Sequence, residues 1–175
     1  MEVKMKPRAM LLIGMIAAAA ALRLLPHPSN FTPIGALALF AGAHFDDKRW
    51  AFIVPLAAMF LSDILIGFHG QMPVVYAAFA VIVCMGFALK EKKTALRVTG
   101  ASLAAATFFF IVSNFAVWAF DGLYPMTFQG LVTCYVAAIP FFQNWLLGTL
   151  FYAAVLFGGF AFLESKLAVL APARG

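Results

Sequence analysis

Two strongly polar side chains stand inside apolar runs of this sequence and are the first candidates for chemistry. Asp63 lies five residues before the end of the run 51–68, and Asn114 lies six residues before the end of the run 98–120. A carboxylate or an amide inside a lipid-facing helix is costly, so each marks either a bond between helices or a contact with a ligand. Asp63 could pair with Arg23 in an earlier run, and both interpretations stay open for Asp63 and Asn114.

Further polar and aromatic side chains lie at the same depth or in the connections on that side of the chain. Aromatic walls with a few convergent polar groups are typical of a ligand pocket. Trp118 also has an interpretation as a membrane-interface residue, and the loop histidines as solvated side chains. We predict an outward-opening substrate pocket formed by Arg23, His27, Asn30, Asp63, His69, Tyr76, Asn114, Trp118 and Asn144.

Patterns that support catalysis or metal binding are absent from the sequence. It has no Gly-rich phosphate loop ending in Lys-Ser/Thr, no G-x-S-x-G and no H-E-x-x-H. The two cysteines, Cys84 and Cys134, lie in apolar runs without the spacing of metal ligands. We predict that the chain is not an enzyme and that it holds neither a metal nor another cofactor.

The composition indicates which elements must position these residues. Apolar residues make up 65% of the chain and charged residues 11%, whereas a soluble domain has roughly 45–50% and about 25%. Because so few polar side chains cannot cover a water-facing surface, we predict a single domain whose solvent is the lipid bilayer. The net charge of +5 does not indicate nucleic acid, because the basic residues lie at the ends of apolar runs.

The apolar runs predict helices that cross the membrane. A crossing needs about 20 residues, and the last run, 131–163, is too long for one crossing and is interrupted by Pro140. We expect a short interfacial or re-entrant helix at 131–139, followed by a helix that Pro140 helps to start. The predicted spans are 10–25, 34–45, 51–68, 73–89, 98–120 and 141–163.

The distribution of Lys and Arg decides whether the short run 34–45 crosses. If it does, and the N-terminus is inside, eleven basic residues lie inside and only Arg23 lies outside. If it does not, three lie inside and nine outside, against the positive-inside rule. We therefore predict an all-α integral membrane protein with six transmembrane helices and both termini in the cytoplasm. The inner basic residues are Lys4, Lys6, Arg8, Lys48, Arg49, Lys90, Lys92, Lys93, Arg97, Lys166 and Arg174.

Small residues recur four apart in the run 10–25, which lets another helix approach closely. They form a face made of Gly14, Ala17, Ala18 and Ala21. This face could pack inside the chain or dock on a partner protein, and the sequence leaves both alternatives open.

Four stretches cover most of the chain from Arg23 to Gly159. They are HPSNFTPIGALALFAGAHF at 27–45, RWAFIVPLAAMFLSDILIGFH at 49–69, SNFAVWAF at 113–120 with Tyr124 and Pro125, and CYVAAIPFFQNWLLGTLFY at 134–152. In these stretches the chain resembles a small family of bacterial membrane proteins described as candidate transporters. More widely, it resembles the substrate-binding S components of energy-coupling-factor (ECF) transporters. It departs from the small family at Thr149, where the resemblance leads us to expect an acidic residue.

The resemblance implies an S-component-like helix bundle in the inner membrane of a bacterium. It implies capture of a vitamin or other micronutrient outside, while the small-residue face of the first helix docks on the transmembrane and ATPase subunits of an ECF module. A cobalamin-type cargo, with His27 or a cysteine on cobalt, is one option. The alternative is a structural or scaffold membrane protein whose polar residues only lock helices together.

Overall fold

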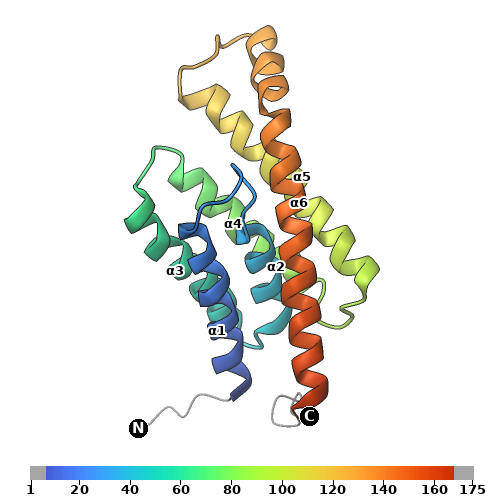
Figure 1. Ribbon diagram of the computed structural model, residues 1–175. Helices are drawn as coiled ribbons and strands as arrows, with labels where there is room; N and C mark the ends of the chain where they lie inside the picture. The colour runs from blue at the N-terminus through green and yellow to red at the C-terminus, as the bar shows by residue number, and fades with distance from the viewer. Residues whose placement is uncertain (1–6, 168–175) are drawn as a thin grey trace.

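The computed structural model describes residues 7–167, which form six α-helices and one short 3-10 helix, with no strand in that range. The α-helices run alternately up and down the bundle in chain order (Figure 1). The all-α prediction is confirmed. The elements are α1 (Pro7–Ala21), η1 (Leu22–Leu24), α2 (Ile34–His44), α3 (Lys48–Ile66), α4 (Met72–Phe87), α5 (Ala95–Phe120) and α6 (Phe128–Lys166).

Much of the exterior of the bundle is apolar. Among the described residues, α3, α5, α6 and α1 together with η1 are long and apolar enough to cross a membrane, while α2 and α4 are shorter apolar helices. Large apolar side chains such as Leu61, Leu65 and Phe151 lie exposed on this exterior. These features are those of a helical membrane protein, because helices satisfy their own backbone hydrogen bonds in lipid.

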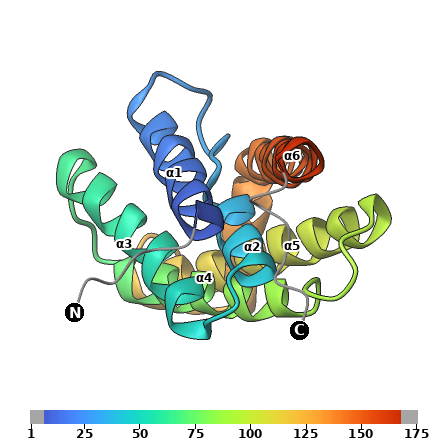
Figure 2. The ribbon, with the colours of Figure 1, turned by 90° about the horizontal axis from the view of Figure 1, so that it is seen from below.

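The short helix α2 lies at the centre of the bundle, and all eleven of its residues are buried (Figure 2). It crosses α4 so closely that a Cβ on Gly42 would overlap the carbonyl oxygen of Val83, and a Cβ on Gly86 would overlap that of Leu39. Glycine on both helices therefore lets the two backbones touch. Because protein surrounds α2, it does not need the length of a helix that faces lipid.

The structure corrects the prediction for the last apolar run. The segment 131–139 is not a separate interfacial or re-entrant helix, because α6 is continuous through Pro140. The neighbouring helix α5 supports both sides of the proline. The Phe110 ring lies 5.5 Å from the Tyr135 ring and 4.5 Å from the Phe142 ring, measured between centroids. Packing against α5 offsets the one backbone hydrogen bond that a proline removes.

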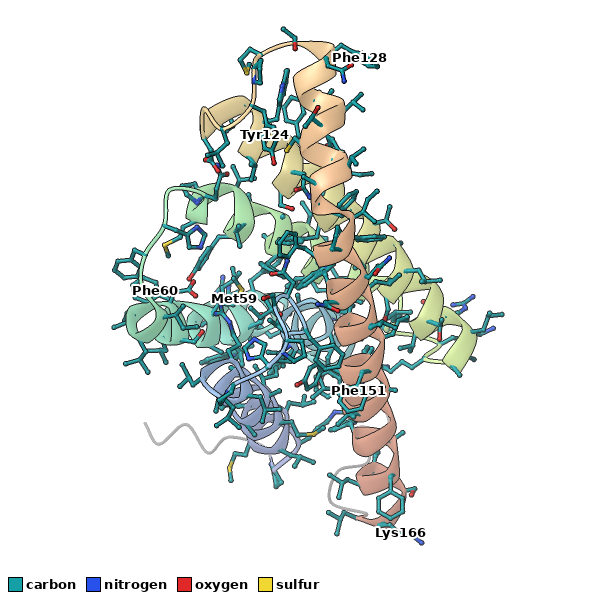
Figure 3. The ribbon with its side chains drawn as sticks, turned by 45° about the horizontal axis from the view of Figure 1, so that its top comes forward. Met59, Phe60, Tyr124, Phe128, Phe151 and Lys166 are labelled. Carbon is teal, nitrogen blue, oxygen red and sulfur yellow. The ribbon has the colours of Figure 1, made fainter. Side chains whose placement is uncertain are left out.

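The length of α6 sets the shape of the molecule. Its 39 residues, at 1.5 Å per residue, span about 58 Å, whereas the hydrocarbon layer of a bilayer is about 30 Å thick. Phe128 and Lys166 accordingly lie at opposite ends of the molecule (Figure 3). The first turns of α6 and the last turns of α5 project beyond the other helices (Figure 1).

Contacts among charged residues define the lower end of the bundle as drawn in Figure 1. An ion pair between Arg8 and Glu164 joins the start of α1 to the end of α6. Lys90 Nζ donates to the carbonyl oxygen of Asp46 at 3.4 Å and so joins the α4–α5 connection to the α2–α3 connection.

Cations gather at this lower end. Of the nine Lys and Arg residues in the described range, eight lie in the helix ends and connections there, and Arg23 alone lies at the upper end. Burial, together with the charge of Arg8, lowers the pKa of Lys93 in the connection before α5. Three further cations used in the topology count, Lys4, Lys6 and Arg174, lie outside the described residues.

The small-residue face of α1 points away from the core of the bundle. Gly14, Ala17, Ala18 and Ala21 are exposed, while the opposite side of α1 is buried. With residues of α3, this face borders an open apolar groove of about 210 Å³. In the single chain, these four residues therefore do not form part of the core.

Candidate functional site

The predicted pocket residues do not share one site, and the first group that they form is an ionic clamp. Arg23 Nη1 lies 2.9 Å from Asp63 Oδ1 and also donates to the hydroxyl of Ser62. The Tyr76 hydroxyl donates to Asp63 Oδ2 at 2.7 Å. Both carboxylate oxygens of Asp63, which is only 3% exposed, therefore have partners inside the chain. The clamp, made of Arg23, Ser62, Asp63 and Tyr76, joins η1, α3 and α4.

Helix α3 presents the clamp residues on its inner face. Met59, one turn before Asp63, is 2% exposed, whereas its neighbour Phe60 is 47% exposed and lies on the outer side (Figure 3). The 3-10 turn after α1 carries Arg23 to this inner face. Of the two interpretations that the sequence left open for Asp63, the pairing with Arg23 is present in the structure.

The second group lines a half-polar cavity of about 140 Å³ between α5, α6 and the connection before α2. We call it the polar cavity. Asn30 and Asn114, both predicted as pocket residues, meet here. Neither Asp63 nor Arg23 borders it. Its remaining wall includes Phe109, Phe110, Ser113, Phe142 and Trp145.

Hydrogen bonds inside α5 determine which polar atoms this cavity offers. Asn114 Nδ2 donates to the Phe110 carbonyl at 2.8 Å, and the Ser113 hydroxyl donates to the Phe109 carbonyl at 2.7 Å. A carbonyl accepts only from the nitrogen of an amide, so the Asn114 oxygen is the atom left over. The Ser113 hydroxyl hydrogen and one of the two N–H groups of Asn114 are used locally. Both side-chain oxygens and the second N–H of Asn114 remain.

The connection 25–33 covers this region and is attached to α6. Asn144 Nδ2 donates to the carbonyl oxygen of Ser29 at 3.0 Å. The Phe31 ring lies 5.8 Å from the Phe151 ring. A Cβ on Gly148 would lie 3.1 Å from the Phe31 Cα, so glycine allows this close approach. Asn30 has a φ of 64°, a left-handed conformation that asparagine tolerates better than most residues.

Two buried polar atoms near the cavity have no hydrogen-bond partner among the described residues, Trp145 Nε1 and Thr149 Oγ1. Both side chains pack against Gly35 of α2, where a Cβ would lie 2.9 Å from Thr149 Oγ1 and 3.0 Å from the Trp145 ring. The indole nitrogen is covered by other atoms and does not reach the cavity surface. Thr149, which stands where the resemblance leads us to expect an acid, does not itself border the cavity.

The remaining predicted residues belong to neither group. His27 is exposed, and its Nδ1 lies 2.6 Å from the Leu25 carbonyl oxygen. His69 is exposed in the connection between α3 and α4. Trp118 Nε1 donates to the Pro125 carbonyl at 3.0 Å, which closes the α5–α6 connection. These three residues lie at the upper end but do not line the polar cavity.

Sequence reasoning missed several wall residues that helical spacing could have found. Phe110 lies four residues before Asn114, and Phe109 lies four residues before Ser113, so each pair shares a helix face. Phe142 lies three residues before Trp145 on α6 in the same way. The sequence does not predict which faces of α5 and α6 pack together, because both helices are apolar nearly all round.

The chain belongs to a family whose description is "family of unknown function" (DUF6580), and the match covers residues 3–171. No curated protein and no solved structure matches it. The described residues hold no group of three or more His, Cys, Asp or Glu side chains that could bind a metal ion. The resemblance to S components therefore stays a prediction.

We expect Asp63→Asn to destabilise the folded protein by about 3 kcal/mol, because it leaves the partly buried guanidinium of Arg23 without its counter-charge. Tyr76→Phe should cost about 1 kcal/mol, since it removes one hydrogen bond to the same carboxylate. Thermal unfolding of the purified variants in detergent measures both effects.

The double variant Arg23→Met, Asp63→Leu is the matched control for the clamp. It removes both charges together and should recover most of the lost stability. An Asp63→Asn protein that unfolds like the parent but no longer binds its ligand would show instead that Asp63 contacts the ligand directly.

Proposed function

We propose that this chain is a membrane substrate-binding subunit that captures a vitamin or another micronutrient and passes it to a separate ATPase module for uptake. The polar cavity carries the proposal. It opens at the upper end of the bundle, has aromatic walls, and contains amide and hydroxyl acceptors without partners of their own. Asn114 does not hold two helices together, because its amide nitrogen donates to a carbonyl of its own helix.

The topology we propose has six crossings in the inner membrane of a bacterium, with both termini in the cytoplasm. The alternating direction of the helices and the gathering of cations at the lower end support it. In this arrangement the lower end faces the cytoplasm and the polar cavity lies on the outer side. α2 would cross as a short helix enclosed by protein, which removes the usual requirement for length.

The docking surface we propose is the small-residue face of α1 with the adjoining groove. Ala17 and Ala21 border the groove on one side, and Ala58, Leu61 and Leu65 of α3 border it on the other. Small side chains let a partner helix come close, and close packing drives helix association in lipid. The partners would be the transmembrane and ATPase subunits of an ECF-type module, because the sequence has no nucleotide-binding loop.

The size of the polar cavity bears on the cargo. Pockets for drug-sized ligands measure about 300–1,000 Å³, whereas this cavity measures about 140 Å³. Neither His27 nor a cysteine borders it. These dimensions favour a small micronutrient over a cobalamin-type cargo.

The clamp favours a second candidate function, that of a structural or scaffold membrane protein. Its carboxylate is fully partnered inside the chain, so Asp63 serves helix packing in either function. The two proposals differ in the polar cavity, which a scaffold does not need.

Mass spectrometry of small molecules that purify with the protein tests capture directly. We expect a stoichiometric micronutrient with the parent chain and its loss with Asn114→Ala, which removes an acceptor from the cavity wall. Deletion of the gene should reduce uptake of the same compound by cells. A chain that is empty from every growth medium, in cells with unchanged uptake, would favour the scaffold function.

Cysteine labelling in intact cells tests the topology. In a chain whose native cysteines are replaced, Lys92→Cys should resist a membrane-impermeant maleimide, because the connection before α5 would face the cytoplasm. Leu123→Cys, exposed in the connection between α5 and α6, is the control that should be labelled from outside. Rapid labelling of Lys92→Cys in sealed cells would contradict six crossings.

Bulky substitutions on α1 test the docking surface. We expect Ala17→Trp and Ala21→Trp to reduce uptake at least tenfold while ligand binding by the purified chain stays unchanged, because the indole blocks close helix approach. Ala104→Trp, at an exposed alanine of α5, is the matched control and should transport normally. If both α1 variants also transport normally, this face is not the docking surface.

A further inference from the structure

We propose that the polar cavity selects a small, flat molecule that donates hydrogen bonds and is neutral or positively charged, and that it rejects anions of the same shape. This inference rests on the proposed function for the biological role of the site, but it concerns the chemical class of the ligand. It follows from the hydrogen-bond inventory of the wall, the aromatic surfaces and the distribution of charge.

The wall offers acceptors more than donors. One N–H of the Asn114 amide and the hydroxyl hydrogen of Ser113 are donated to carbonyl groups one turn earlier in α5. Of the donors on these two side chains, only the second N–H of Asn114 is left, against two oxygens. Their oxygens can still accept. The indole N–H of Trp145 is covered and does not reach the cavity surface. The exposed amide of Asn30 can present either a donor or an acceptor by turning over.

Aromatic rings make up most of the remaining wall. The Phe109 and Trp145 rings lie 4.6 Å apart, and the Phe110 and Phe142 rings lie 4.5 Å apart, measured between centroids. The face of an aromatic ring carries partial negative charge, so it attracts polarised N–H groups and cations and repels anions. Flat ligands also stack on such surfaces.

No charged side chain borders the cavity among the described residues. The cation at this end of the bundle, Arg23, is already paired with Asp63 in the clamp. A carboxylate or phosphate entering the cavity would lose its hydration without gaining a counter-charge, which is costly.

The volume matches a ligand of about one substituted ring. An apolar cavity of about 150 Å³ accommodates benzene, and the polar cavity measures about 140 Å³. A single aromatic ring with one amide or amidine group matches both this size and the acceptors of the wall.

Three probes of nearly identical shape separate these requirements. Benzamidine is a cation with donors only, benzamide is neutral with a donor and an acceptor, and benzoate is an anion with acceptors only. We expect benzamidine and benzamide to bind the purified full-length chain in detergent at least tenfold more tightly than benzoate. Isothermal titration measures the affinity, and the concentration-dependent rise in melting temperature confirms it.

Substitutions of the wall locate the binding. Asn114→Leu keeps a side chain of similar size but removes the acceptor, and it should weaken benzamide binding at least tenfold. Gln143→Leu, an equivalent change at an exposed amide of α6 that does not border the cavity, should leave the affinity unchanged. Ser113→Ala serves as a second test of the wall, with a smaller loss, if Asn114→Leu does not fold.

The inference is overturned if benzoate binds as tightly as benzamide, if none of the three probes binds, or if Asn114→Leu folds and binds benzamide unchanged. Failure of the proposed function would look different. Probes that rank as expected, with micronutrient uptake unaffected by gene deletion, would preserve the ligand class and remove the transport role. An anionic compound found stoichiometrically in the protein, and taken up by cells, would preserve the transport role and overturn the ligand class.

Discussion

A polar group inside this bundle must find its hydrogen-bond partner within the chain, because lipid offers none. The clamp meets this requirement completely, since Arg23, Ser62 and Tyr76 surround the carboxylate of Asp63. α5 meets it locally, by returning the side-chain donors of Ser113 and Asn114 to its own backbone. At the polar cavity, the oxygens of both side chains and the second N–H of Asn114 stay unmatched. Open hydrogen-bonding groups gathered at one cavity distinguish a site from a helix contact.

The same requirement explains how a helix as short as α2 can lie at the centre. Its eleven residues are buried, so its ends meet protein rather than hydrocarbon. Direct backbone contact at Gly42 and Gly86 brings α4 against it. In contrast to α2, α6 is far longer than a bilayer is thick. It depends on packing against α5 to remain helical through Pro140.

Sequence patterns predicted those features that follow from the chemistry of one residue or one segment, whatever packs beside it. A buried carboxylate needs a counter-charge, so the pairing of Asp63 with Arg23 was foreseeable. A run of apolar residues needs a helix, so the positions of α2 to α5 were foreseeable within a few residues. The continuity of α6 was not foreseeable, because the effect of Pro140 depends on the neighbour that packs beside it. The walls of the polar cavity depend likewise on how two uniformly apolar helices face each other.

The common depth of the polar residues, which suggested one pocket, has a different physical cause in the structure. The clamp fixes the chain at Arg23, and α2 begins at Ile34. Between these points the connection is attached to α6, where Asn144 bonds to Ser29, and the next residue, Asn30, borders the cavity. The clamp and the cavity therefore lie at one level because a single short connection joins them. Asp63 contributes to the site through this connection: by holding Arg23, it fixes one end of the segment that carries Asn30.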